Sequence, residues 1–254
     1  MRVVIAGGHG KIALLLEQLL TQRGDQAVAL IRNPAHVADV EKTGAEAAVV
    51  DLETASAGDV AALLDGADAV VFAAGAGPNS GAARKDTVDR GASVLLAEAA
   101  GQAGVRRFVQ ISGMGVDQPP AAGTDEVWAA YVTAKFAAEE DLRARDLDWT
   151  VLRPGGLTDD PGTGQVALAT PPLPRGRIPR ADVAAFDQHE LESIPGVAMA
   201  GVRPDIRPRG RECPMAVHGI GAVLNCVRGA ILDCPCGAAA RVGIRPERRD
   251  HGAL

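Results

Sequence analysis

The chain has 254 residues, a length that suits one α/β domain or a domain with an appendage. Its net charge of −6 gives no general attraction to nucleic acid or to an anionic membrane. No apolar run reaches the roughly 18 residues that a membrane span needs, and no signal peptide is recognisable. We therefore expect a cytoplasmic protein that binds neither nucleic acid nor membrane.

Short apolar runs alternate with segments of helical periodicity over the first 153 residues. The predicted strands are Arg2–Ala6, Gln26–Ile31, Glu46–Val50, Ala69–Ala73, Arg107–Ile111 and Trp149–Leu152. The predicted helices are Lys11–Arg23, Ala35–Thr43, Ala57–Leu64, Lys85–Ala103 and Glu126–Arg145. Branched apolar strands of this kind are buried on both faces, as in a parallel sheet. The order predicts an α/β fold, a doubly wound parallel sheet (Rossmann fold), with its ligand crevice at the carboxyl ends of the strands.

The first predicted strand breaks at once into a glycine-rich turn. Gly7 and Gly10 lack Cβ, so the backbone can turn tightly and approach a pyrophosphate, while the first amides of the following helix point at the phosphates. Ala13 is small enough to let that helix pack closely on the strand. Glycine-rich turns also occur without a ligand, so the spacing alone does not establish a nucleotide site. The cofactor-binding residues that we assign to this turn are Gly7, Gly8, His9, Gly10, Lys11 and Ile12.

Tyr131 and Lys135 lie four residues apart in a predicted helix and therefore share one face. A lysine beside a phenol lowers the phenol pKa from about 10 towards neutrality, which suits proton exchange with a carbonyl or an alcohol. Tyr131 is the only tyrosine of the chain. Ser112 ends the fifth predicted strand, at the same crevice, and is a candidate to hold a substrate oxygen. The alternatives are a surface tyrosine beside a solvated lysine, and a serine that serves a turn.

Further short segments follow the other predicted strands: Arg32-Asn33-Pro34, Asp51-Leu52, Ala73-Ala74-Gly75 and Leu152-Arg153-Pro154-Gly155. With these motifs, residues 1–186 resemble the short-chain dehydrogenase/reductase superfamily, in particular its atypical NAD(P)-binding branch that is similar to NAD-dependent epimerases and dehydratases. The resemblance implies that Tyr131 is the acid/base, that Lys135 binds the nicotinamide ribose, and that Ser112 orients the substrate. It also implies cofactor contacts from Asp51, Leu52, Ala73, Ala74, Gly75 and Pro154.

Arg32 stands 22 residues after Gly10, near the position where an NAD enzyme places a carboxylate on the adenosine ribose. Its planar fork suits a 2′-phosphate, although an exposed loop arginine is the alternative. We therefore predict NADP rather than NAD as the cofactor, in an oxidoreductase that exchanges a hydride with a small carbonyl or alcohol substrate. The alternatives are a non-catalytic NAD(P)-binding redox sensor and an epimerase or dehydratase. We expect a monomer or a homodimer.

From about Asp187 the hydrophobic periodicity fails. Residues 187–254 carry nine arginines and no lysine, and they contain all four cysteines of the chain, Cys213, Cys226, Cys234 and Cys236. A single Cys-x-Cys does not match the spacing of a zinc site, so we predict no metal. The sequence therefore divides into an NAD(P)-binding domain, residues 1–186, and an irregular tail, residues 187–254. The tail is either translated from a shifted reading frame or a disordered extension.

Overall fold

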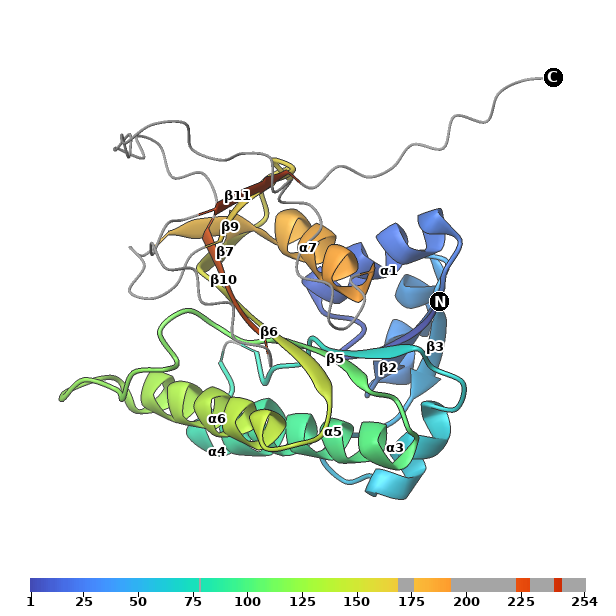
Figure 1. Ribbon diagram of the computed structural model, residues 1–254. Coiled ribbons are helices and arrows are strands. Elements are labelled where there is room, and N and C mark those ends of the chain that lie inside the picture. The colour runs from blue at the N-terminus through green and yellow to red at the C-terminus, as the bar shows by residue number, and fades with distance from the viewer. Residues whose placement is uncertain (78, 169–175, 193–222, 229–239, 244–254) are drawn as a thin grey trace.

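The computed structural model describes residues 1–77, 79–168, 176–192, 223–228 and 240–243. A parallel sheet of six strands forms its centre, in the order β6-β5-β4-β1-β2-β3 (Figure 1). The strands are β1 (Arg2–Ala6), β2 (Gln26–Ile31), β3 (Glu46–Val49), β4 (Ala69–Phe72), β5 (Arg107–Ile111) and β6 (Asp148–Pro154). Strand order reverses at β1, which is the topology of a doubly wound Rossmann sheet. The predicted fold class is confirmed.

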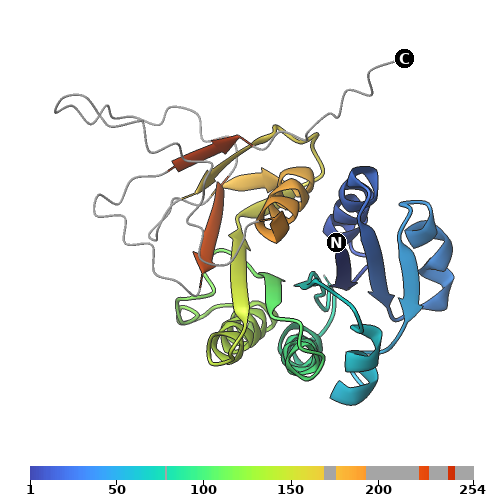
Figure 2. The ribbon, with the colours of Figure 1, turned by 45° about the vertical axis from the view of Figure 1, so that its right-hand side comes forward.

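Helices cover both faces of this sheet (Figure 2). One face carries α3 (Ala57–Leu63), α5 (Ser93–Gln102) and α6 (Glu126–Arg143), and the other carries α1 (Lys11–Arg23) and α7 (Arg180–Glu192). The predicted helix at residues 35–43 is a 3₁₀ turn, η1 (Pro34–His36), followed by α2 (Val37–Glu41). The predicted helix at residues 85–103 is a π-helix, η2 (Lys85–Ala92), that continues into α5 and is preceded by the short α4 (Ala82–Arg84). None of the helices in the described ranges is long and apolar enough to cross a membrane.

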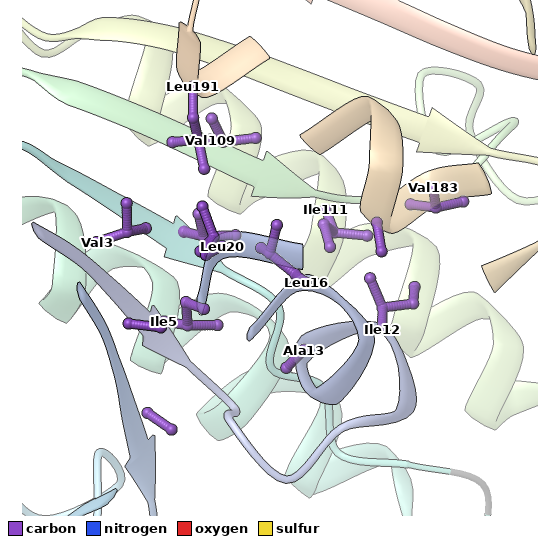
Figure 3. Close-up of a cluster of buried hydrophobic side chains, with 14 of the residues drawn as sticks. Val3, Ile5, Ile12, Ala13, Leu16, Leu20, Val109, Ile111, Val183 and Leu191 are labelled. Atoms are coloured by element: carbon purple, nitrogen blue, oxygen red, sulfur yellow. The ribbon is translucent and has the colours of Figure 1, made fainter. Parts of the chain in front are cut away.

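The apolar residues divide into two cores, one on each side of the sheet. Figure 3 shows the first, in which Ile12 and Leu16 of α1 and Val183 of α7 lie around Ile111 of β5, while Leu191 of α7 lies over Val109. The second lies under α3, α5 and α6. Because both faces of the central strands are covered, β4 and residues 3–6 of β1 are apolar and buried, as the sequence predicted.

Helix α7 extends six residues beyond the predicted domain boundary at residue 186. Phe186 and Leu191 are fully buried, and the Arg107 guanidinium donates a hydrogen bond to the Leu191 carbonyl. The prediction of an irregular chain from residue 187 is therefore wrong for residues 187–192. The helix escaped prediction because Asp187 and Glu190 occupy buried positions in it. These carboxylates interrupt the apolar stripe by which a helix is recognised in a sequence.

Two strands of the tail also lie in described residues. β10 (Val223–Arg228) pairs antiparallel with β6, and β8 (Gln165–Leu168) joins β10 to β11 (Ala240–Gly243). A separate two-stranded sheet consists of β7 (Gly156–Thr158) and β9 (Arg177–Pro179). The rest of the tail, residues 193–222, 229–239 and 244–254, lies outside the described residues, and with it Cys213, Cys234 and Cys236. The two hypotheses for the tail, a shifted reading frame and a disordered extension, therefore stay predictions.

Glu17 generates a prediction about stability. It is fully buried on α1, and its Oε2 accepts a hydrogen bond from the Thr43 hydroxyl at 3.1 Å. Burial raises the pKa of Glu17 from 4.5 to about 7, although the Thr43 hydrogen bond opposes this change. The folded protein thus holds this proton more tightly than the unfolded chain, so the stabilisation is complete below about pH 4.5 and is lost as the pH rises through 7.

We expect Glu17→Gln to remove this pH dependence. The free energy of unfolding of the variant, relative to that of the parent, should rise by up to about 3 kcal/mol between pH 5 and pH 8. Urea unfolding at a series of pH values measures it, with Glu98→Gln on the exposed face of α5 as the control. Parallel curves for the parent and the Glu17 variant would contradict the assignment.

Candidate functional site

The turn between β1 and α1 is held against two neighbouring strands. Gly7 has a φ of +80°, and a Cβ there would lie 2.6 Å from the Cα of Ala74, in the segment after β4. The amides of Gly7 and Gly8 both donate to the Leu30 carbonyl of β2, at 3.2 and 3.1 Å. Helix α1 then starts at Lys11, with Gly10 as its N-cap, and no side chain caps its first amides. These amides and the positive end of the helix dipole are therefore available to a phosphate.

A pocket of about 350 Å³ opens beside this turn, at the carboxyl ends of β1, β2, β3 and β4. It brings together nine of the residues predicted to bind the cofactor. They are Gly7, His9, Gly10, Arg32, Asp51, Leu52, Ala73, Ala74 and Gly75. Residues from four loops thus converge where the topology of the fold places a ligand.

The other predicted cofactor residues lie outside this lining. Gly8 packs against Ala29 of β2, where a Cβ would collide. Lys11 forms an exposed ion pair with Asp159 at 2.5 Å, and the Ile12 side chain belongs to the apolar core. Pro154 ends β6, where its carbonyl accepts from the Met114 amide. Of these, Lys11 and Ile12 remain able to offer the backbone amides that begin α1.

Sequence reasoning missed three polar residues that line the pocket, Asn33, His36 and Glu53. The rings of His36 and His9 stack with their centroids 3.6 Å apart, and His9 Nε2 lies 3.2 Å from an Asp39 carboxylate oxygen. Glu53 is two residues past the Asp51 that the sequence did single out. Asn33 stood in the Arg32-Asn33-Pro34 segment without an assigned role, and no local pattern marked His36 or Glu53, because the convergence of these residues depends on how the loops after β1, β2 and β3 pack together.

Arg32 lines the pocket as predicted, but its guanidinium is not free. Its NH1 lies 2.7 Å from Glu53 Oε2, and Arg84 NH2 reaches the same oxygen at 2.6 Å. The Thr87 hydroxyl donates to the other carboxylate oxygen at 2.6 Å. The hydrogen bond from Thr87 and the arginines hold the pKa of Glu53 below its usual range. Arg32, the residue predicted to bind the 2′-phosphate, is therefore already paired with a carboxylate.

Lys135 connects helix α6 to the pocket wall. Its buried ammonium donates to the carbonyl of Ala74 at 3.4 Å and to that of Ile111 at 3.2 Å, and it lies 3.4 Å from the buried carboxylate of Asp89 in η2. Asp89 also accepts from the Ala76 amide at 3.1 Å. Burial lowers the pKa of Lys135, and Asp89 opposes this change. The Lys135 ammonium thus lies directly behind residues 73–75, which line the pocket.

Tyr131 lies one helical turn before Lys135, with its hydroxyl against Gly113. A Cβ at Gly113 would be 2.7 Å from this hydroxyl, so a larger residue would displace the ring. Among the described residues, none hydrogen-bonds the hydroxyl. Burial raises the pKa of Tyr131 above its ordinary value, and the carboxylates of Asp89 and Glu139 raise it further. The pKa of Tyr131 is thus shifted in the direction opposite to the predicted depression by Lys135, chiefly because the phenol is desolvated.

The Ser112 hydroxyl, which was predicted to face the crevice, is engaged inside the protein. This buried hydroxyl donates to Glu139 Oε1 at 2.6 Å, and Arg153 NH2 reaches Glu139 Oε2 at 2.5 Å. Glu139 follows Lys135 by four residues, on the same face of α6, and this spacing is a signal that the sequence offered. The serine is thus part of a buried network that joins β5, α6 and β6, and this geometry does not support the predicted contact with a substrate.

The pocket and the buried cluster fit a dinucleotide cofactor. The turn leaves no room for a Cβ at Gly7, the first amides of α1 have no side-chain cap, and the cation of Lys135 lies behind Ala74. Within the described residues, no three side chains of His, Cys, Asp or Glu converge as metal ligands would. The arrangement can bind a pyrophosphate in a pocket whose wall at Ala74 is contacted from behind by the Lys135 ammonium.

Comparisons with known proteins agree with this geometry. Residues 7–192 match the model of a family described as NAD(P)H-binding. YhfK of Bacillus subtilis, named as an uncharacterized sugar epimerase, is 36% identical over 185 residues, which cover 72% of this chain and 85% of that protein. A Bacillus halodurans structure, named as a candidate NAD-dependent epimerase/dehydratase, superposes with a TM-score of 0.67 at 26% identity, covering 90% of this chain and 94% of its own. The anaerobilin reductase ChuY of Escherichia coli O157:H7 gives 0.63 at 25%, covering 77% and 92%.

The half-buried phenol can be tested directly, because Tyr131 is the only tyrosine and the phenolate absorbance reports its ionisation alone. We expect the folded protein to show no phenolate signal near pH 10, where the chain unfolded in urea should titrate at about pH 10. Circular dichroism at each pH separates ionisation from unfolding, and Tyr131→Phe supplies the blank. If the Tyr131 phenol of the folded protein titrates at a lower pH than that of the unfolded chain, Lys135 does lower its pKa, as the sequence predicted.

Proposed function

The chain belongs to the NAD(P)H-binding family, and from that premise we propose that it is an NADP-dependent oxidoreductase of the short-chain dehydrogenase/reductase type. It acts on a small carbonyl or alcohol substrate. The observation that carries the proposal is the contact of Lys135 with Ala74, since one residue of the Tyr131–Lys135 pair touches the wall of the nucleotide pocket. Tyr131 lies one helical turn before Lys135 on α6, so the lysine connects the phenol to the loops that form the pyrophosphate site, and this supports redox chemistry there.

The residues of the chain have separate tasks in this proposal. The turn at Gly7 and the first amides of α1 bind the pyrophosphate, and the residues from Ala73 to Gly75 form the floor under the ribose. A bound nicotinamide cofactor supplies or accepts the hydride. Lys135 binds the nicotinamide ribose, and Asp89 holds its ammonium in place.

Tyr131 moves the proton. Because burial keeps the phenol protonated, Tyr131 suits the reduction of a carbonyl, in which its hydroxyl donates a proton to the substrate oxygen. Gly113 is required beside it, because any larger residue would push the hydroxyl away. Ser112 acts only indirectly, through the Glu139 carboxylate that it shares with Arg153.

Arg32 favours NADP over NAD, because its guanidinium stands at the pocket rim and can bind a 2′-phosphate with charge-assisted hydrogen bonds. An epimerase or dehydratase is the second candidate, favoured by the name of the relative YhfK. Such an enzyme retains its cofactor through the cycle. It would change its substrate without net consumption of NADPH, and this distinguishes the two candidates.

Replacing Tyr131 tests the chemistry. We expect Tyr131→Phe to lower turnover by roughly 10²- to 10⁴-fold while NADPH affinity stays within about twofold, because the ring still packs and only the proton-transfer group is lost. NADPH oxidation with a panel of carbonyl compounds measures it. The control is Trp128→Phe, which alters the aromatic partner that stacks on Tyr131 at 5.1 Å and leaves the hydroxyl in place. NADPH binding without turnover of any compound would favour the redox sensor.

Replacing Arg32 tests the cofactor. We expect Arg32→Gln to weaken NADPH binding about ten- to a hundredfold and to leave NADH binding within about twofold, because one charge-assisted contact is lost. Titration of nicotinamide fluorescence measures both nucleotides. Arg106→Gln, which removes an exposed arginine at the opposite end of the sheet, is the matched control. Equal affinity of the unaltered protein for NADPH and NADH would remove Arg32 from the argument.

A further inference from the structure

Glu53 joins three separate elements at the rim of the nucleotide pocket. Its carboxylate is reached by Arg32 from the end of β2, by Arg84 from α4 and by Thr87 from η2. Both arginines approach the same oxygen, Oε2, at 2.7 and 2.6 Å. The loop that carries Glu53 is itself fixed, because the Glu53 amide donates to Asp51 at 3.0 Å. Two guanidinium groups from distant parts of the chain thus converge on one point.

Two arginines that converge in this way form an anion-binding site, and the Glu53 carboxylate is the anion that occupies it. The Glu53 side chain is 21% exposed, whereas those of Arg32 and Arg84 are 54% and 40% exposed. The arginines therefore present their outer N–H groups to solvent while the carboxylate lies between them. Ion pairs at such exposure contribute little to stability, so exchange of the carboxylate for a better anion costs little.

A phosphate monoester is the better anion. It carries a charge of about −1.5 to −2 and three acceptor oxygens, against one charge and two oxygens for a carboxylate. Arg32 and Glu53 both line the nucleotide pocket, next to Asp51 and Asn33, so the phosphate in question is one carried by the bound nucleotide. Glu53 opposes that phosphate in two ways, because it repels the charge and because it occupies the two arginines.

We propose that Glu53 and Arg84 determine cofactor specificity: Arg84 completes the 2′-phosphate site with Arg32, and Glu53 is the internal counterion that the 2′-phosphate must displace. The inference rests on the proposed function, since it concerns the same pocket. It assigns roles to two residues outside the glycine turn and the Tyr131–Lys135 pair. In this proposal the two arginines favour NADP and the Glu53 carboxylate opposes it. Removing the carboxylate therefore strengthens the preference for NADP.

Glu53→Gln tests the counterion, because the amide keeps the shape and the hydrogen bond from Thr87 but loses the charge. We expect the dissociation constant of NADPH to fall by about three- to tenfold and that of NADH to stay within about twofold. Glu46→Gln, at the other end of β3, removes the same charge without touching the pocket and should change neither. The gain should shrink at high salt, since exposed charges are screened.

Arg84→Gln tests the second half of the site. We expect NADPH to bind about three- to tenfold more weakly, with NADH unchanged. A Glu53→Gln variant that leaves the ratio of the two dissociation constants unchanged overturns the counterion role. One that weakens NADH shows instead that Glu53 holds the ribose hydroxyls, and overturns it as well. If the unaltered protein binds neither nucleotide, the proposed function fails together with this inference, whereas normal binding with unresponsive variants overturns the inference alone.

Discussion

The backbone contact between Gly7 and Ala74 is the constraint on which the pocket depends. The chain leaves β1, turns with a positive φ at Gly7 and passes so close to the segment after β4 that no side chain fits between them. Hydrogen bonds from two successive amides to the Leu30 carbonyl fix the same turn to β2. Three strand ends are thereby held together, and the start of α1 is aimed at the space that they enclose. The lining of the pocket and its contact with Lys135 both follow from this arrangement.

On the other side of Ala74, the face of α6 carries Tyr131, Lys135 and Glu139 at successive helical turns. The two charged residues of this face each have a buried partner of opposite charge. Lys135 has Asp89, and Glu139 has Arg153. Buried charges are costly unless they are paired, so these partners hold the helix in one position relative to η2 and β6. Burial raises the pKa of Tyr131 above its ordinary value, and the carboxylates of Asp89 and Glu139 raise it further.

The segment that contains α4 and η2 contacts both parts of the site. Arg84 and Thr87 reach Glu53 at the pocket rim, and Asp89 reaches Lys135 behind the pocket. A π-helix is rare and occurs often at functional sites. Here η2 packs along α6 and carries both Thr87, which bonds to Glu53 at the rim, and Asp89, which pairs with the buried lysine. Binding at the rim and the position of the lysine are thus linked through one short helix.

The sequence by itself determined the fold, the glycine turn and most of the pocket, because these depend on local patterns. Apolar runs such as residues 3–6 mark strands that are covered on both faces, and Gly7, Arg32 and Asp51 stand at strand ends that any parallel sheet gathers at one edge. Only the tertiary structure decided the partners of the charged groups. Asp187 and Glu190 broke the apolar stripe of α7 because burial in that helix includes carboxylates. Ser112 bonds to Glu139, Lys135 pairs with Asp89, and Arg32 pairs with Glu53. These pairs join residues from distant elements, and the spacing of residues along the chain does not reveal which of them meet in space.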